Sequence, residues 1–131
     1  MRFGSAGGLL LAVALAAPVA AGDGHSARKP RLDLRASPRL ALLPVDVFVI
    51  AELVGGDETE DFYCPAIEWE WGDGNRSAQE SDCPPFRPGM ALARRHSASH
   101  AYRKPGEYSI KVTLRRVGRA LAAATTQVDI R

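Results

Sequence analysis

The feature that most constrains the fold of this chain is an alternation of apolar and polar residues with a period of two. In the clearest segment, Val45, Val47 and Val49 occupy every second position before the pair Gly55-Gly56. Successive side chains of a β-strand point to opposite faces, so this pattern predicts a strand with one face in a core. The pattern occurs in five segments, at residues 31–35, 45–53, 67–71, 108–115 and 126–131.

Turn signals separate these segments, at Ser37-Pro38, Gly55-Gly56, Gly72-Asp73-Gly74 and Pro105-Gly106. Only residues 121–124 show a weak helical preference, and no long amphipathic helix competes with the strands. With 131 residues, 46% of them hydrophobic, the chain can build one core of ordinary size but not two. We therefore expect an all-β protein, a two-sheet β-sandwich similar to the immunoglobulin architecture.

The amino end has the three-part pattern of a secretory signal peptide. Arg2 supplies the positive start, residues 9–17 are apolar, and Val19 and Ala21 are the small residues before the cut. The apolar run is shorter than the roughly 18 residues that a membrane span requires. We expect residues 1–21 to be removed, residues 22–30 to be a flexible lead-in and residues 31–131 to form the domain. The mature protein would be secreted, periplasmic or extracellular, without a membrane span.

The two cysteines, Cys64 and Cys83, have 18 residues between them. In an oxidising compartment this pair predicts a disulfide, which would stabilise the fold by roughly 3 kcal/mol. Zinc binding is the alternative, because Cys83, His96 and His100 have the spacing of the second half of a zinc finger. The first half of that pattern is missing, which favours the disulfide.

Two motifs carry a resemblance to the polycystic kidney disease (PKD) domain family. Trp69-Glu-Trp-Gly-Asp-Gly74 resembles its W-x-F/W-G-D-G turn, and residues 100–112 resemble its H-x-Y-x-x-P-G-x-Y-x-V stretch. The resemblance covers residues 31–131 and implies an immunoglobulin-like sandwich that serves as a protein or carbohydrate interaction module. The disulfide would join segments 55–65 and 75–99 and is not part of the general family pattern. The motif residues are Trp69, Trp71, Gly72, Asp73, Gly74, His100, Tyr102, Pro105, Gly106 and Tyr108.

Most of the motif residues have a structural explanation. Trp69 and Trp71 point to one face of a strand and fill the core. The glycines permit a tight turn, in which the Asp73 carboxylate accepts bonds from backbone N–H groups. Tyr102 is expected to form a tyrosine corner, and His100 to hold the same corner.

Catalytic and metal-binding signals are weak. Glu68 and Glu70 are expected about 7 Å apart on one face of a strand, a separation found between the two carboxylates of inverting glycosidases. Any two residues that are two positions apart on a strand have this separation, so the signal is weak. The acidic residues Asp57, Glu58, Glu60 and Asp61 lack the spacing of an EF-hand calcium loop. Residues 75–77 form a glycosylation sequon. We expect no enzyme and no cofactor.

Two surfaces are candidates for an interaction. The net charge of +2 is too low for typical nucleic-acid binding. The first half of the domain sequence is nevertheless acidic and the second half basic. Cross-strand pairing should neutralise much of that charge. The remaining cations could hold an anionic polysaccharide, and the first four are the leading candidates: Arg94, Arg95, Arg103, Lys104, Arg116 and Arg119.

The second surface is apolar. Phe48 and Ile50 would face outward if the valines beside them face the core. Phe86, Met90 and Leu92 would either cover that pair or form a patch of their own. The expected function is an exported interaction module for an unknown protein or polysaccharide at the cell surface; a structural spacer or envelope component without a ligand is the alternative, and a metal-binding protein a weaker one.

Overall fold

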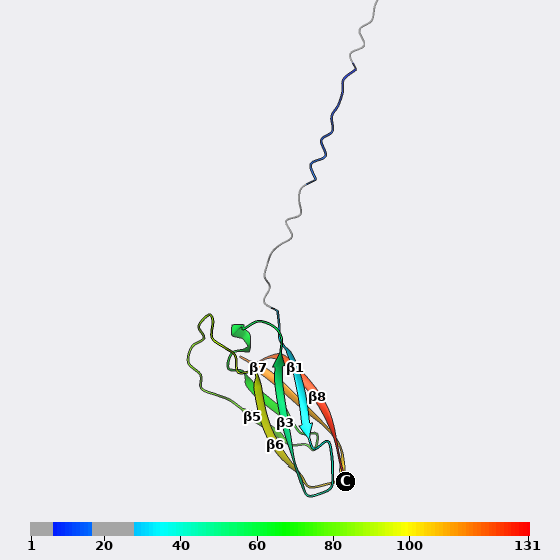
Figure 1. Ribbon diagram of the computed structural model, residues 1–131, viewed down its shortest axis with the longest axis vertical. Coiled ribbons are helices and arrows are strands. Elements are labelled where there is room, and N and C mark those ends of the chain that lie inside the picture. Colours follow the sequence, from blue (N-terminus) through cyan, green and yellow to red (C-terminus); the bar gives the residue numbers. More distant parts are fainter. Residues whose placement is uncertain (1–6, 17–27) are drawn as a thin grey trace, which may run out of the picture.

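The computed structural model describes residues 7–16 and 28–131, and the second range folds into a β-sandwich (Figure 1). One sheet has the strand order β1-β3-β6, with β1 (Arg31–Ser37), β3 (Val45–Val54) and β6 (Arg95–Tyr102). The other has the order β2-β8-β7-β4-β5, and a 3-10 turn, η1 (Glu60–Phe62), precedes β4. Its strands are β2 (Leu40–Ala41), β4 (Ala66–Glu70), β5 (Arg76–Gln79), β7 (Gly106–Arg116) and β8 (Arg119–Ile130). The all-β sandwich expected from the sequence is confirmed.

The core lies between the two sheets and follows the period-two pattern. Val47 and Val49 of β3 are fully buried, as are Trp69 of β4 and Val112 of β7. Neighbouring strands pair in antiparallel register, except that β2 runs parallel to β8. The chain thus changes sheet after β1, so that its first strands belong to both layers.

The structure contains two further strands that the five-strand pattern did not predict, β5 and β6, as well as the two-residue β2. All four residues of β5 are exposed, so the strand has no apolar face to produce an alternation. In β6 the inward positions are occupied by His96, Ala98, His100 and Tyr102, which are only weakly apolar as a group. Residues 121–124, which have a weak helical preference, lie in β8 because they pair with β7.

A disulfide joins Cys64, which follows η1, to Cys83 in the irregular segment 80–94, with an S–S distance of 2.07 Å. The predicted bridge is therefore confirmed. Tyr63 donates its hydroxyl to the carbonyl of Pro84 at 2.6 Å and packs on Phe86, with 5.3 Å between ring centroids. Leu92, at the end of this segment, is buried in the core. Within segment 80–94, Phe86 thus packs on Tyr63 and Leu92 on the core, while Met90 is partly buried and its sulfur accepts the N–H of Arg87.

Most of the expected signal peptide and lead-in, residues 1–6 and 17–27, lies outside the described residues. Residues 7–16 are exposed and have no regular secondary structure. The last three residues of the lead-in contact the domain, since the N–H of Arg28 donates to the Asp57 carboxylate at 2.8 Å and Pro30 is buried. Within residues 7–16 and 28–131, no helix is long and apolar enough to cross a membrane.

Candidate functional site

The Gly72-Asp73-Gly74 turn after β4 positions the polar residues of the candidate site. Gly72 has φ +85°, and a Cβ there would lie 2.7 Å from the carbonyl oxygen of Ser109. A side chain is therefore excluded both by backbone conformation and by space. The Asp73 carboxylate accepts the N–H of Asn75 at 3.0 Å, which closes the turn.

Asp73 also pairs with His100 across the two sheets. Nε2 of His100 lies 2.7 Å from Oδ2 of Asp73, and both side chains are less than one-fifth exposed, at 17% and 18%. Burial alone would raise the pKa of Asp73, but the hydrogen bonds from His100 and Asn75 outweigh burial and hold that pKa below its usual value. Asp73 is thus a carboxylate that fastens the turn to β6.

A continuous stack of aromatic rings extends from this pair through the core. Trp69 stacks on Trp71 with 5.7 Å between centroids, and Trp71 stacks on His100 at 4.8 Å. His100 meets Tyr102 edge-on at 4.9 Å, and Tyr102 packs on Tyr108 at 4.3 Å. Because these residues come from β6 of one sheet and from the β4 and β7 side of the other, we call them the inter-sheet stack. The packing contacts of the inter-sheet stack are the physical reason that aromatic residues occur at these positions of the two motifs.

The tyrosine corner is made by Tyr108 and not by Tyr102, contrary to our expectation from the sequence. The hydroxyl of Tyr108 donates to the carbonyl of Lys104, four residues earlier, at 2.6 Å. That of Tyr102 donates to the carbonyl of Trp71 in the opposite layer at 2.6 Å, and burial raises the pKa of Tyr102. His100 accordingly fastens the turn at Asp73 rather than the corner.

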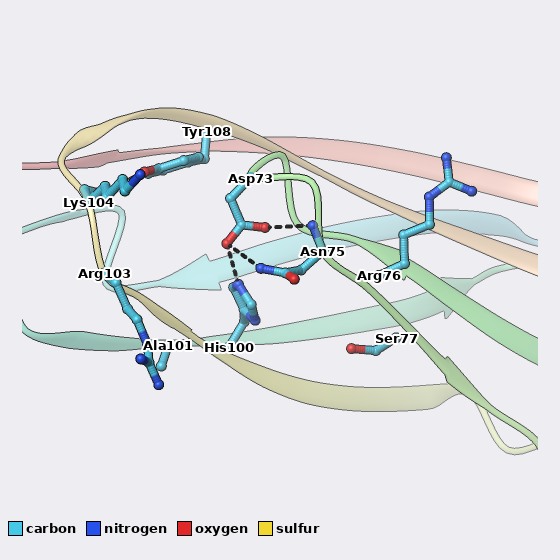
Figure 2. A pocket seen from close by; sticks show the side chains of 9 residues that line it. All are labelled: Asp73, Asn75, Arg76, Ser77, His100, Ala101, Arg103, Lys104 and Tyr108. Carbon is cyan, nitrogen blue, oxygen red and sulfur yellow. Dashed lines mark hydrogen bonds and ion pairs between the residues drawn. The ribbon is translucent and has the colours of Figure 1, made fainter.

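Beside the turn lies an open depression of about 630 Å³, which we call the turn depression (Figure 2). Figure 2 shows Asp73, Asn75 and His100 at its centre, with Arg76 on one side and both Lys104 and Arg103 on the other. Within the described part of the chain, neither Arg103 nor Lys104 forms an ion pair. The lining residues are Asp73, Asn75, Arg76, Ser77, His100, Ala101, Arg103, Lys104 and Tyr108.

The depression contains the residue types of a hydrolytic triad, but they do not form its hydrogen-bond chain. The Ser77 hydroxyl accepts the indole N–H of Trp71 at 2.9 Å, and no hydrogen bond joins Ser77 to His100 among the described residues. A nucleophile needs a base within hydrogen-bond reach. Ser77 therefore orients Trp71, while His100 orients the turn.

The four leading basic candidates do not form one surface. Arg94 donates to Glu58 at 2.9 Å and to the carbonyl of Gly55 at 2.7 Å, so it holds loop residues in place. Arg95 pairs with Glu52 at 3.4 Å. Only Arg103 and Lys104 line the turn depression, where Arg76 joins them. The sequence pattern missed Arg76, although its position two residues after the predicted turn was a usable signal.

The acidic candidates are paired with basic or backbone groups. Hydrogen bonds from the Leu92 N–H and from Arg94 lower the pKa of Glu58, and Asp57 accepts the N–H of Arg28. Glu60 and Asp61 pair with Arg116 and Arg119, Glu68 with Arg115, and Glu70 with Arg76. No cluster of three or more metal-ligand side chains occurs in residues 7–16 and 28–131. The charge halves of the sequence are therefore neutralised largely by contacts between distant segments.

The remaining predicted residues lie apart from the turn depression. Phe48 and Ile50 lie on the outer face of β3, where their exposed fractions are 60% and 39%. Cys83 is held in the disulfide, so its thiolate is not available for the zinc pattern. His96 points inward, its Nε2 has no hydrogen-bond partner among the described residues, and burial lowers its pKa. Thus the structure brings together the turn and His-x-Tyr motifs, but not the apolar pair.

Comparison with known proteins finds neither a matching family model nor a matching curated protein. Among solved structures, the PKD domain of an M14-like peptidase from Thermoplasmatales archaeon SCGC AB-540-F20 is similar, with a TM-score of 0.54 and 16% identity over 79% of this chain and 97% of that chain. A CARDB domain from Pyrococcus furiosus, in complex with di-metal ions, has a TM-score of 0.45 and 10% identity over 79% of this chain and 94% of that chain.

The strand order, the sheet change after β1 and the inter-sheet stack define an immunoglobulin-like β-sandwich. Within that class the fold is of the PKD type, as the similarity to the peptidase's PKD domain and the placement of both motifs show.

Proposed function

We propose that this chain is an exported, non-catalytic interaction module that binds an acidic polysaccharide at the turn depression. The observation that carries the proposal is the group of three cations, Arg76, Arg103 and Lys104, around one open depression. Two of these cations have no ion-pair partner within the described chain, which leaves their charge available to a ligand. A volume of about 630 Å³ also falls in the range of small-molecule sites.

The chemistry of the lining favours a charged sugar over an apolar ligand. Arg76, Arg103 and Lys104 donate hydrogen bonds and carry charge, and the Asn75 and Ser77 side chains can bond hydroxyl groups. The aromatic rings at this end of the molecule pack against one another in the inter-sheet stack, so they offer little apolar surface to a ligand. A carboxylated or sulfated chain satisfies these donors, whereas a neutral glucan leaves the cations unpaired.

Binding to immobilised acidic polysaccharide tests this proposal. With polygalacturonate or heparin, the wild-type protein should bind at low ionic strength and lose affinity as salt is added, because exposed charges are screened. Replacing both Arg103 and Lys104 by glutamine should weaken binding about tenfold, at roughly 1 kcal/mol or less for each exposed contact. The measurement is a titration by biolayer interferometry.

The matched control removes the same charge at Arg35 and Lys111, which are exposed and lie outside the depression. Arg35→Gln with Lys111→Gln should bind as the wild type does. Equal loss of affinity in both double variants would show that net charge alone drives the binding. If neither polysaccharide is bound at low salt, the proposal is wrong and the spacer alternative is favoured.

Export is part of the proposed function and rests on the amino-terminal pattern. When the full chain is produced in a secreting host, the exported protein should begin at Gly22 and contain an oxidised pair of cysteines. Intact-mass spectrometry with and without reductant measures both properties. A product that retains residues 1–21, or one found only inside the cell, would contradict the export proposal.

A further inference from the structure

Strand β6 is an edge strand of the three-stranded sheet, and half of its backbone groups point away from that sheet. The N–H of Leu53 donates to the carbonyl of Arg94 at 2.7 Å, and this fixes the phase of the β3–β6 ladder. Even-numbered residues from 96 to 102 therefore bond to β3. The N–H and C=O groups of Arg95, Ser97, Ser99 and Ala101 point outward.

Of the four strands that end a sheet in the described chain, β6 is the longest, with eight residues against seven for β1. After β1 the chain crosses to β2, which pairs with the last two residues of β8. β2 has two residues and β5 has four. Natural edge strands are protected by charged side chains, especially lysine, and by proline, bulges or short length. In its eight residues β6 has no proline, no lysine and no register shift against β3, and its one arginine, Arg95, is its first residue.

A single hydrogen bond reaches the outward groups of β6 among the described residues. Nε2 of Gln79, at the end of β5, donates to the carbonyl of Ser97 at 3.3 Å. This side chain is exposed and the bond is long. A carbonyl oxygen can accept two hydrogen bonds, so Gln79 need not leave when another N–H approaches.

The sequence of β6 is symmetric about Ala98, since residues 96–100 read His-Ser-Ala-Ser-His in both directions. If two copies of this strand pair antiparallel about a two-fold axis at Ala98, Ser97 lies opposite Ser99 of the partner. Both residues have outward backbone groups, so the hydrogen-bonded positions coincide. Arg95 lies opposite Ala101 of the partner, and no like charges meet directly within the strand.

We propose that β6 is the contact through which two copies of this chain associate, forming one continuous six-stranded sheet. The contact is isologous, as a closed two-fold dimer requires. It supplies backbone hydrogen bonds at Ser97 and Ser99 together with cross-strand serine pairs, and it uses the longest strand that ends a sheet in the described chain. His100 and Ala101 of β6 also line the turn depression, but the pairing does not use the side chains of the proposed polysaccharide contacts Arg103 and Lys104.

The test measures oligomeric state as a function of concentration. In sedimentation equilibrium or light scattering, the mature wild-type protein should change from monomer to dimer as its concentration is raised to about 1 mM. Ser99→Pro removes an N–H that points away from β3, so it should prevent the dimer without removing a bond inside the monomer. Ser99→Ala keeps that N–H and should still dimerise.

Circular dichroism must show that the proline variant remains folded. If it does not, hydrogen exchange of the wild-type protein decides the question, because the amides of Ser97, Ser99 and Ala101 should exchange more slowly as concentration rises. The proposal is overturned by a monomer at every concentration, by a folded Ser99→Pro variant that still dimerises, or by concentration-dependent protection located elsewhere. Gln79→Ala should leave dimerisation intact; its loss in that variant would also contradict the proposed pairing.

Discussion

Replacing Trp71 by alanine is expected to lower the free energy of unfolding by about 3–5 kcal/mol, the range found for large aromatic residues in cores. Trp71 is fully buried and stacks on both Trp69 and His100. Its loss leaves a cavity in the middle of the inter-sheet stack and removes the N–H that Ser77 accepts. Such a change is a large fraction of the 5–15 kcal/mol that stabilises a typical domain. Urea denaturation followed by circular dichroism measures it.

The control for this prediction is the exposed aromatic Phe48. Phe48→Ala removes a side chain that is 60% exposed and should change stability by about 0.5 kcal/mol or less. If Trp71→Ala costs no more than Phe48→Ala, the inter-sheet stack does not stabilise the sandwich in the way described. If Phe48→Ala is as damaging as Trp71→Ala, the outer face of β3 is covered in solution.

Removing the disulfide is expected to lower the free energy of unfolding by roughly 3 kcal/mol, because closing a loop of this length restricts the unfolded chain by about that amount. The bridge joins residues outside the strands, so the double variant Cys64→Ser with Cys83→Ser should keep the sandwich. The consequence should be greatest in segment 80–94, where Phe86 and Leu92 pack. Thermal unfolding with and without a reductant measures the effect.

The double serine variant provides its own control, since a reductant should lower the melting temperature of the wild type and leave the variant unchanged. Wild-type protein that melts at the same temperature in both conditions would contradict the prediction. If the double serine variant has no β-sheet circular dichroism spectrum before it is heated, the bridge is needed for folding itself.

The strands with one strongly apolar face could be predicted from the sequence because burial imposes the alternation directly. β3, β4 and β7 each place a row of large apolar side chains between the sheets. β6 could not be found in this way, because its inward row begins with His96 and Ala98. Its place in the sheet depends on pairing with β3 and on the stacking of His100 and Tyr102, which only the tertiary fold supplies.

The candidate site was predictable in its residue types and not in its contacts. The turn chemistry of Gly72 and Asp73 follows from local geometry, so the Asp73 bond to a backbone N–H was foreseen. The pairing of Asp73 with His100 spans 27 positions and depends on how the two sheets are opposed. For the same reason the use of Arg94 to hold Glu58, 36 positions away, was not visible in the pattern of charge.

The inter-sheet stack has a consequence for spectroscopy. Both tryptophans of the chain, Trp69 and Trp71, lie side by side within it, and neither is exposed to solvent. Fluorescence excited at a wavelength that tryptophan absorbs and tyrosine does not therefore arises from one place, the junction of the two sheets. A shift of its emission to longer wavelength would report separation of the sheets, while circular dichroism reports the strands themselves. Comparing the two signals during unfolding would show whether the two sheets separate before their strands unfold.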